Sequence, residues 1–185
     1  MNFKYYSINQ DVFTKNTLEK IVNENNDNQS VAVLTFSSGR YIVSGSKDVI
    51  EESLQLPMPT GSIIFSQNSV VYLFNSRTKY YYRDIIDKIL PTLFQQMSLI
   101  THLKWEFISN DIVVNGAKIG SLSRFKCADT YCTGVFFSGI NENDVIEQKC
   151  TKQRTKESIG LKDLFITDMQ LIEHFNNACQ SFELS

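Results

Sequence analysis

Two residues of this sequence carry a side chain that could take part in group transfer, one cysteine and one lysine. Cys150 lies close to Lys149 and Lys152. Neighbouring positive charge lowers the pKa of a thiol, and the thiolate is the form that acts as a nucleophile. Lys118 follows an Asn-Gly pair, and an ammonium group on a strand can stabilise negative charge that develops on an oxygen. The ordinary alternatives are a solvated basic loop around Cys150 and a lysine that points at water.

Other reactive constellations are missing. The sequence has neither of the glycine-rich phosphate-binding patterns, GxxxxGK[ST] and GxGxxG, and no GxSxG nucleophile elbow. Its cysteines form no CxxC pair, and its two histidines stand apart from them, so we expect no metal site. The residues concerned are Cys127, Cys132, Cys150, Cys179, His102 and His174.

The composition is that of an ordinary globular chain of 185 residues, 42% hydrophobic and 21% charged, which suffices for one sizeable core. The formal net charge of −2 lacks the basic excess typical of nucleic-acid binding, so we expect no nucleic-acid partner. No stretch is apolar enough for a signal peptide or a membrane span. This predicts a cytoplasmic protein that makes no membrane contact and keeps its thiols reduced.

The hairpin that carries Lys118 is the clearest local structure in the sequence. Residues 111–114 and 117–122 are β-prone runs joined by Asn115-Gly116. Both central residues of a type I′ turn need positive φ, which Asn and Gly adopt most easily. We therefore expect two antiparallel strands, with Lys118 near the start of the second.

The remaining elements follow from hydrophobic periodicity and turn residues. Pro91 predicts a kink or a late start in the longest helix, and Ser37-Ser38-Gly39 is interpreted as the turn of a hairpin. Helices are expected over 14–22, 49–56, 83–97, 143–150 and 168–182, and further strands over 31–36, 41–44, 62–65, 70–74, 105–108 and 133–137. This order predicts one domain spanning residues 1–185, of the α+β class, with a mixed, mostly antiparallel sheet and helices on one side.

The segment 110–122, NDIVVNGAKIGSL, resembles a stretch of the biotin ligase, lipoate ligase and octanoyltransferase superfamily that reads roughly N-D-h-h-h-N-G-x-K-h-x-[SG], where h is apolar. The resemblance implies a biotin/lipoate ligase-like fold. It also implies that Lys118 reaches the acyl carbonyl and, in a ligase, the phosphate of the acyl-adenylate. Asn110, Asp111 and Ser121 would then shape the substrate pocket.

The resemblance continues to the C-terminus. Thr133 and Gly134 fall where the family has a His-Gly pair that opens a strand, and both would contact substrate. Cys150 lies about two positions before the place of the acyl-accepting cysteine of the octanoyltransferases. Residues 158–164, SIGLKDL, are similar to the segment that precedes the final helix of the ligases.

The N-terminal half departs from the family. The glycine-rich segment that holds the acyl chain would correspond to residues 59–68, where only Gly61 remains and Ser66 replaces a histidine. A side chain in place of a glycine fills space that the ligand would need. Together with the loss of the histidine at Thr133, this change puts catalysis in doubt.

Three hypotheses follow. The first is a lipoate ligase-like or octanoyltransferase-like acyltransferase with Lys118 and Cys150 as its catalytic residues, a lipoyl or acyl carrier domain as its partner, and ATP and magnesium as cofactors only if it is a ligase. The second is a pseudoenzyme of the same fold that binds a protein partner, for example a viral or phage accessory or virion protein. Aromatic residues such as Tyr80, Tyr81 and Tyr82 would suit such an interface. The third is an unrelated fold in which the hairpin match is a coincidence.

Overall fold

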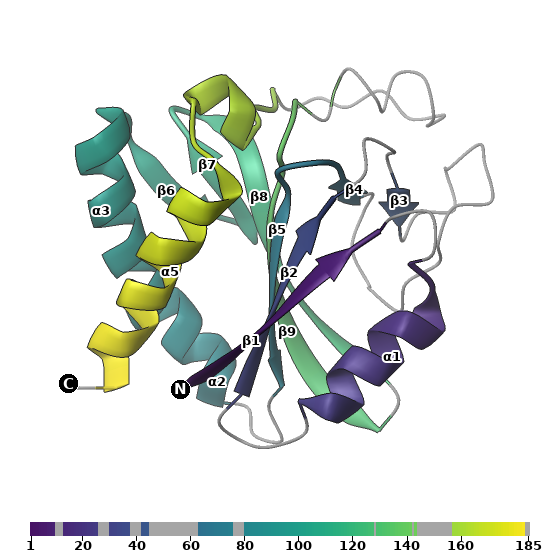
Figure 1. Cartoon of the computed structure of the whole chain (residues 1–185). Coiled ribbons are helices and arrows are strands. Elements are labelled where there is room, and N and C mark those ends of the chain that lie inside the picture. Colours follow the sequence, from purple (N-terminus) through teal and green to yellow (C-terminus); the bar gives the residue numbers. More distant parts are fainter. Residues whose placement is uncertain are drawn as a thin grey trace.

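A sheet of seven strands forms the centre of the protein (Figure 1). The structure, a computed structural model, describes residues 1–9, 13–25, 30–37, 42–44, 63–75, 80–127, 129–141, 143 and 157–183. The expected helix at 49–56, Gly61 and Cys150 lie outside these ranges, as do residues 144–150 of the expected helix before Cys150.

The strand order of the sheet is β1-β2-β5-β9-β8-β7-β6. All neighbours are antiparallel except β1 and β2, which run parallel. The α+β class with a mixed, mostly antiparallel sheet is therefore confirmed. The strands are β1 (Asn2–Ile8), β2 (Ser30–Phe36), β5 (Val70–Asn75), β6 (Trp105–Ile108), β7 (Asp111–Val114), β8 (Ala117–Cys127) and β9 (Thr130–Phe137). A separate two-stranded sheet pairs β3 (Ile42–Ser44) with β4 (Ile63–Phe65).

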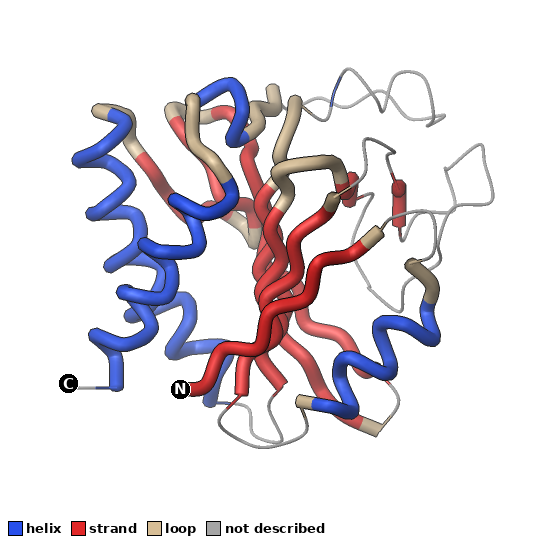
Figure 2. Tube along the Cα trace, in the orientation of Figure 1, coloured by secondary structure: helices blue, strands red, loops and turns tan. Residues whose placement is uncertain are grey.

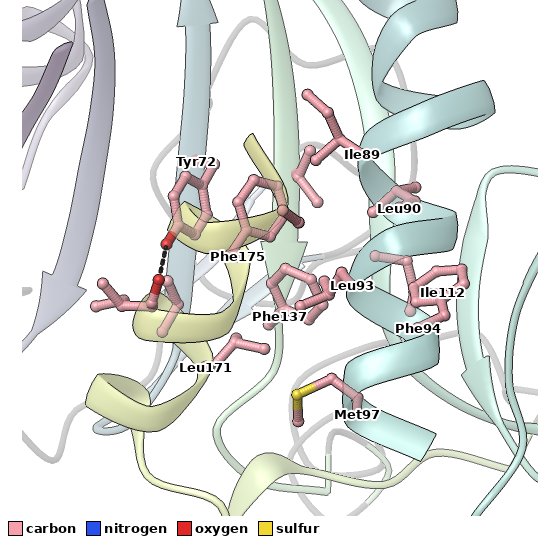
Figure 3. Packing of buried hydrophobic residues seen from close by; sticks show 14 of the residues in the cluster. Tyr72, Ile89, Leu90, Leu93, Phe94, Met97, Ile112, Phe137, Leu171 and Phe175 are labelled. Atoms are coloured by element: carbon pink, nitrogen blue, oxygen red, sulfur yellow. Dashed lines mark hydrogen bonds between the residues drawn. The ribbon is translucent and has the colours of Figure 1, made fainter. Parts of the chain in front are cut away.

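The two long helices cover one face of the seven-stranded sheet. They are α3 (Leu90–Thr101) and α5 (Asp168–Glu183), which lie side by side in Figure 1. The core beneath them is apolar and close-packed (Figure 3), with the rings of Tyr72 and Phe175 stacked 3.8 Å apart between centroids. The Tyr72 hydroxyl donates a hydrogen bond to the Ile172 carbonyl, so the one polar atom of that ring pair is satisfied.

A shorter helix covers the opposite face, so the helices do not all lie on one side of the sheet. It is α1 (Lys15–Glu24), and its buried Leu18, Ile21 and Val22 pack against alternate residues of the same strands. Thr14 caps its first turn by accepting a hydrogen bond from the Thr17 backbone N–H. Figure 2 shows α1 and the helices of the other face on the two sides of the strands.

The helix expected over 83–97 begins earlier and contains a π-helical turn. Its three parts are α2 (Tyr80–Asp84), η2 (Ile85–Ile89) and α3. In η2 the Leu90 N–H donates to the Ile85 carbonyl, five residues back. Pro91 follows at the start of α3 and has no N–H to continue the regular pattern. The wider turn therefore ends at the position where the sequence predicts a kink.

The predicted hairpin of 31–36 and 41–44 is wrong. β2 pairs with β1 on one side and β5 on the other, and β3 pairs with β4 in the small sheet. β2 is buried along almost its whole length, as expected for an inner strand whose two edges are both occupied. The N-terminal strand β1, which supplies one of those neighbours, was not expected from the sequence.

Candidate functional site

The hairpin of β7 and β8 forms as the sequence predicts. Asn115 and Gly116 have φ angles of 47° and 86°, both positive as a type I′ turn requires. The preceding connection, from β6 to β7, has the same property, with φ of 50° at Ser109 and 71° at Asn110. Two tight turns therefore fix the register of β6, β7 and β8, the last of which carries Lys118.

A β-bulge directs the Lys118 side chain. Val113 pairs with Lys118, but the next residue back, Ile112, pairs with Gly120, so β8 holds one extra residue, Ile119. Ile119 packs in the core beneath α3 and α5. Regular pairing would send Lys118 to the same face as Gly120. The extra residue instead turns Lys118 to the opposite face, which is a common use of bulges next to functional sites.

On that face Lys118 forms an ion pair with Asp111. Its Nζ lies 2.9 Å from Asp111 Oδ1, and the two side chains are only 19% and 13% exposed. The Lys118 backbone is held on its other edge by residues 157–159, because its N–H donates to the Glu157 carbonyl and its carbonyl accepts from the Ile159 N–H, each at 2.8 Å. The charge is thus shielded from water and fixed in position.

The structure brings some predicted site residues to this face and separates others from it. Ser121 pairs directly with Asp111, and Gly134 shares the face through its pairing with Ser123 and Leu73. Thr133, one residue earlier on β9, is buried on the helix face of the sheet.

Asn110 takes part in a different set of contacts. Its side-chain oxygen accepts a hydrogen bond of 2.9 Å from the Tyr82 hydroxyl, and the Tyr82 ring lies beneath the Arg124 guanidinium at 5.4 Å. Its backbone carbonyl accepts from the Leu122 N–H. Asn110 therefore ties α2 to the β6–β7 turn, and the structure gives it a structural contact where the sequence predicted only pocket shaping.

Aromatic side chains occupy the space beside Gly134. A Cβ added there would collide with the Phe136 ring. Phe136 belongs to a group of four rings, which we call the Phe cluster, between the small sheet and the large one: Phe13, Phe36, Phe65 and Phe136. Phe65 stacks on Phe36 at 4.7 Å between centroids. Phe65 comes from the segment 59–68, which the sequence assigned to acyl binding, so part of that segment packs against the protein's own rings.

A polar cavity that the sequence did not predict opens at one end of the large sheet. It measures about 610 Å³ and its wall includes Ser7, Thr35, Ser66, Lys162 and Asp168. These residues come from β1, β2, the β4–β5 turn, the 3₁₀ helix η3 (Leu161–Leu164) and the first residue of α5. No local pattern links such distant segments, and only the tertiary fold could reveal the cavity.

The described cysteines are poor nucleophiles. Cys127, Cys132 and Cys179 are all buried, and burial raises the pKa of the Cys132 thiol to about 12. Within the described ranges there is also no cluster of three or more potential metal ligands among His, Cys, Asp and Glu side chains, and no helix long and apolar enough to cross a membrane.

Comparison with known proteins gives a match in structure alone. No family model matches the sequence, and no curated protein matches it either. The fold is similar to that of P. falciparum LipL1 in complex with lipoate, at a TM-score of 0.73 and 13% identity, over 98% of this chain and 62% of that one. It is similar to lipoate-protein ligase A bound with ATP, at a TM-score of 0.71 and 8% identity, over 98% and 84% of the two chains.

A third match is the bipartite lipoate protein ligase of Thermoplasma acidophilum, which was solved in a study of that enzyme and its E2 lipoyl domain. The TM-score is 0.65 at 8% identity, over 98% of this chain and 84% of that one. The chain therefore has a biotin/lipoate ligase fold and spans less than two thirds of LipL1. At such low identity the likeness establishes the architecture and leaves the activity open.

Proposed function

We propose that this protein binds an acyl group beside Lys118 and transfers it to a protein carrier domain, as lipoate ligases do. The observation that carries the proposal is the shielded ion pair of Lys118 and Asp111, which the bulge in β8 turns to the face opposite the long helices. An ammonium group has three donors, and Asp111 Oδ1 takes one of them. The remaining donors can stabilise a carboxylate, phosphate or carbonyl oxygen of a substrate.

The residues around Lys118 fit the phosphate of a nucleotide. The ammonium group is held by Asp111, and the Lys118 backbone is bonded to residues 157–159. A positive charge positioned in this way needs little reorganisation to meet an anion. Bound ATP with magnesium would activate the carboxylic acid for transfer. In this scheme Lys118 holds the oxygen on which charge develops, Asp111 orients the Lys118 side chain, and Ser121 lies next to Asp111 as a further polar group.

Mass spectrometry tests the proposal. The protein is incubated with octanoate or lipoate, ATP and magnesium, and separately with octanoyl-acyl carrier protein, and native and intact spectra are recorded. A retained acyl-adenylate that falls about 100-fold in Lys118→Ala would identify a ligase, since the loss of one charge-stabilising donor costs that much. An octanoyl adduct that disappears in Cys150→Ala would identify a transferase.

The matched control is Lys126→Ala. Lys126 lies on the same strand, is 54% exposed and pairs only loosely with Asp129, at 3.7 Å. Its removal should leave any adduct unchanged. The absence of adducts in both mixtures, from folded wild-type protein, would contradict the proposal.

The Phe cluster favours a second candidate, a pseudoenzyme that binds a protein partner. If the rings beside Gly134 occupy the acyl site, lipoate cannot enter. Phe136→Leu would shorten the ring that fills this space at a small cost in stability. Lipoate binding that appears in Phe136→Leu and is missing from the wild type, measured by calorimetry, would support the pseudoenzyme. Equal binding by both proteins would contradict it.

A further inference from the structure

A segment of three residues takes the place of a strand beside Lys118. β9 pairs with β8 only as far as Gly120, two residues short of Lys118. Lys118 instead forms an isolated parallel bridge with Ser158, and its backbone N–H and carbonyl bond to the residues on either side of that serine. The backbone position of Lys118 therefore depends on how firmly residues 157–159 are held against β8.

The Ser158 side chain attaches this segment to the part of the chain that leaves β9. Ser158 is only 8% exposed. Its hydroxyl donates a hydrogen bond to the Asn141 side-chain oxygen and accepts one from the Asn143 N–H. The Asn143 N–H also donates to the Asn141 side-chain oxygen. The serine hydroxyl thus acts as donor and acceptor at once, and it joins two segments that lie 15 residues or more apart in the sequence.

Beyond Ser158 the same segment is attached through its backbone. The Leu161 N–H donates to the Ser138 carbonyl and the Lys162 N–H to the Gly139 carbonyl, contacts that require no particular side chain. An alanine at position 158 would leave these bonds in place, together with the contact between Asn141 and Asn143. It would release the segment only at the point where it borders Lys118.

We infer that Ser158 is a positioning residue for Lys118. Its hydroxyl keeps residues 157–159 against β8 and so fixes where the Lys118 ammonium group lies relative to Asp111. The inference rests on the role proposed for Lys118 in acyl transfer, and it requires no contact between Ser158 and the substrate. A displacement of about 1 Å can lower the rate of a positioned reaction about 100-fold, so a small shift of the Lys118 backbone is enough to matter.

The coupling energy between Lys118 and Asp111 tests the inference without any measurement of activity. A double-mutant cycle of Lys118→Met and Asp111→Asn, followed by urea denaturation, gives this energy in the wild type and in the Ser158→Ala background. We expect it to fall to less than half of its wild-type value in Ser158→Ala and to return in Ser158→Thr, which keeps the hydroxyl. A coupling energy that is unchanged in Ser158→Ala would overturn the inference.

Ser69→Ala is the matched control for a general loss of stability. Ser69 is 1% exposed, and its hydroxyl accepts hydrogen bonds from the backbone N–H groups of Ser66 and Gly139. Its removal leaves buried donors without a partner, so it should destabilise the protein much as Ser158→Ala does. The coupling between Lys118 and Asp111 should nevertheless stay at its wild-type value. An equal loss of coupling in Ser69→Ala would show that Ser158 has no specific role.

The kinetics of acyl-adenylate formation from octanoate, ATP and magnesium supply the second measurement. Because Ser158 acts through the group that stabilises developing charge, Ser158→Ala should lower kcat about tenfold or more and leave the KM for octanoate nearly unchanged. Ser158→Thr should recover most of the loss, and Ser69→Ala should keep the wild-type kcat. A raised KM at unchanged kcat would contradict the positioning role. If the wild type forms no adenylate, the proposed function fails, and the coupling energy still decides whether Ser158 positions Lys118.

Discussion

The ion pair of Lys118 and Asp111 should contribute more to stability than an ordinary surface pair. Exposed pairs contribute about 0.2–1 kcal/mol, whereas breaking a buried pair costs about 3–5 kcal/mol. Both side chains here are mostly shielded, so we expect a coupling energy of about 1–2 kcal/mol between Lys118→Met and Asp111→Asn. A double-mutant cycle by urea denaturation measures it. The exposed pair of Lys126 and Asp129 serves as the comparison and should give a value near zero.

Gly134 tests whether the Phe136 ring fills the space beside it. Alanine at position 134 would meet that ring and, more loosely, the Phe125 ring. Overpacking of this kind costs about 1–3 kcal/mol, so the unfolding free energy of Gly134→Ala should fall by that amount. Adding Phe136→Leu should restore most of the loss. If the double variant is as unstable as Gly134→Ala alone, then the strand backbone, and not the ring, limits the space.

The buried thiol of Cys132 makes stability depend on pH in the alkaline range. Burial raises its pKa from an ordinary value near 9 to about 12. Below pH 9 the thiol is protonated in both the folded and the unfolded chain, and it adds no pH dependence. Between pH 9 and 12 only the unfolded chain loses the proton, so stability falls by up to about 1.4 kcal/mol per pH unit.

Cys132→Ala should remove this contribution. Urea denaturation of wild type and variant from pH 8 to 10.5 would then show a shallower decline for Cys132→Ala. Tyr72, whose pKa is also raised by burial, leaves part of the decline in both proteins. Identical slopes in the two proteins would mean that Cys132 ionises as readily in the folded state as in the unfolded one.

At the level of elements, the bulge in β8 decides on which face Lys118 lies. Deleting Ile119 should restore regular pairing with β7 and turn the Lys118 ammonium group toward the apolar core beneath the long helices. Burying an unpaired charge costs several kcal/mol, so we expect a loss of more than about 3 kcal/mol in the unfolding free energy.

Ile119→Ala is the control for the deletion, because it removes buried apolar atoms but keeps the extra residue. It should cost about 2–5 kcal/mol, so the two changes are not separated by stability alone. The separating measurement is the effect of Asp111→Asn. It should destabilise the Ile119→Ala protein and leave the deletion variant unchanged. Equal effects in both backgrounds would show that the bulge does not position Lys118.

The sequence predicted those elements whose signal is local. Asn115-Gly116 determines a turn by itself, Pro91 marks the end of the π-helical turn, and the periodic residues of α5 predict a helix that the structure confirms. The bulge at Ile119 could not be predicted, because it depends on how two strands pair. The neighbours of β2 could not be predicted either, since a short buried run does not reveal which strands pair with its two edges.

At the level of the whole molecule, the resemblance of residues 110–122 to the ligase family predicted the fold correctly, although no local pattern indicates the order of the strands in the sheet. The predicted site residues remain predictions. Thr133 and Gly134 point to different faces of the sheet, as consecutive residues of a strand do. The Phe cluster, in contrast, depends on contacts among four distant segments. Such contacts leave no pattern in the sequence.

The strand order predicts how protection against hydrogen exchange varies across the molecule. β5 and β9 lie inside the sheet and are almost wholly buried, whereas β1 and β6 form its edges and each have one neighbour. Amides of inner strands exchange only through global unfolding, and those of edge strands exchange through local opening. Exchange followed by mass spectrometry should therefore show the slowest rates in β5 and β9. Exchange in β1 and β6 that is as slow as in β5 and β9 would contradict this prediction.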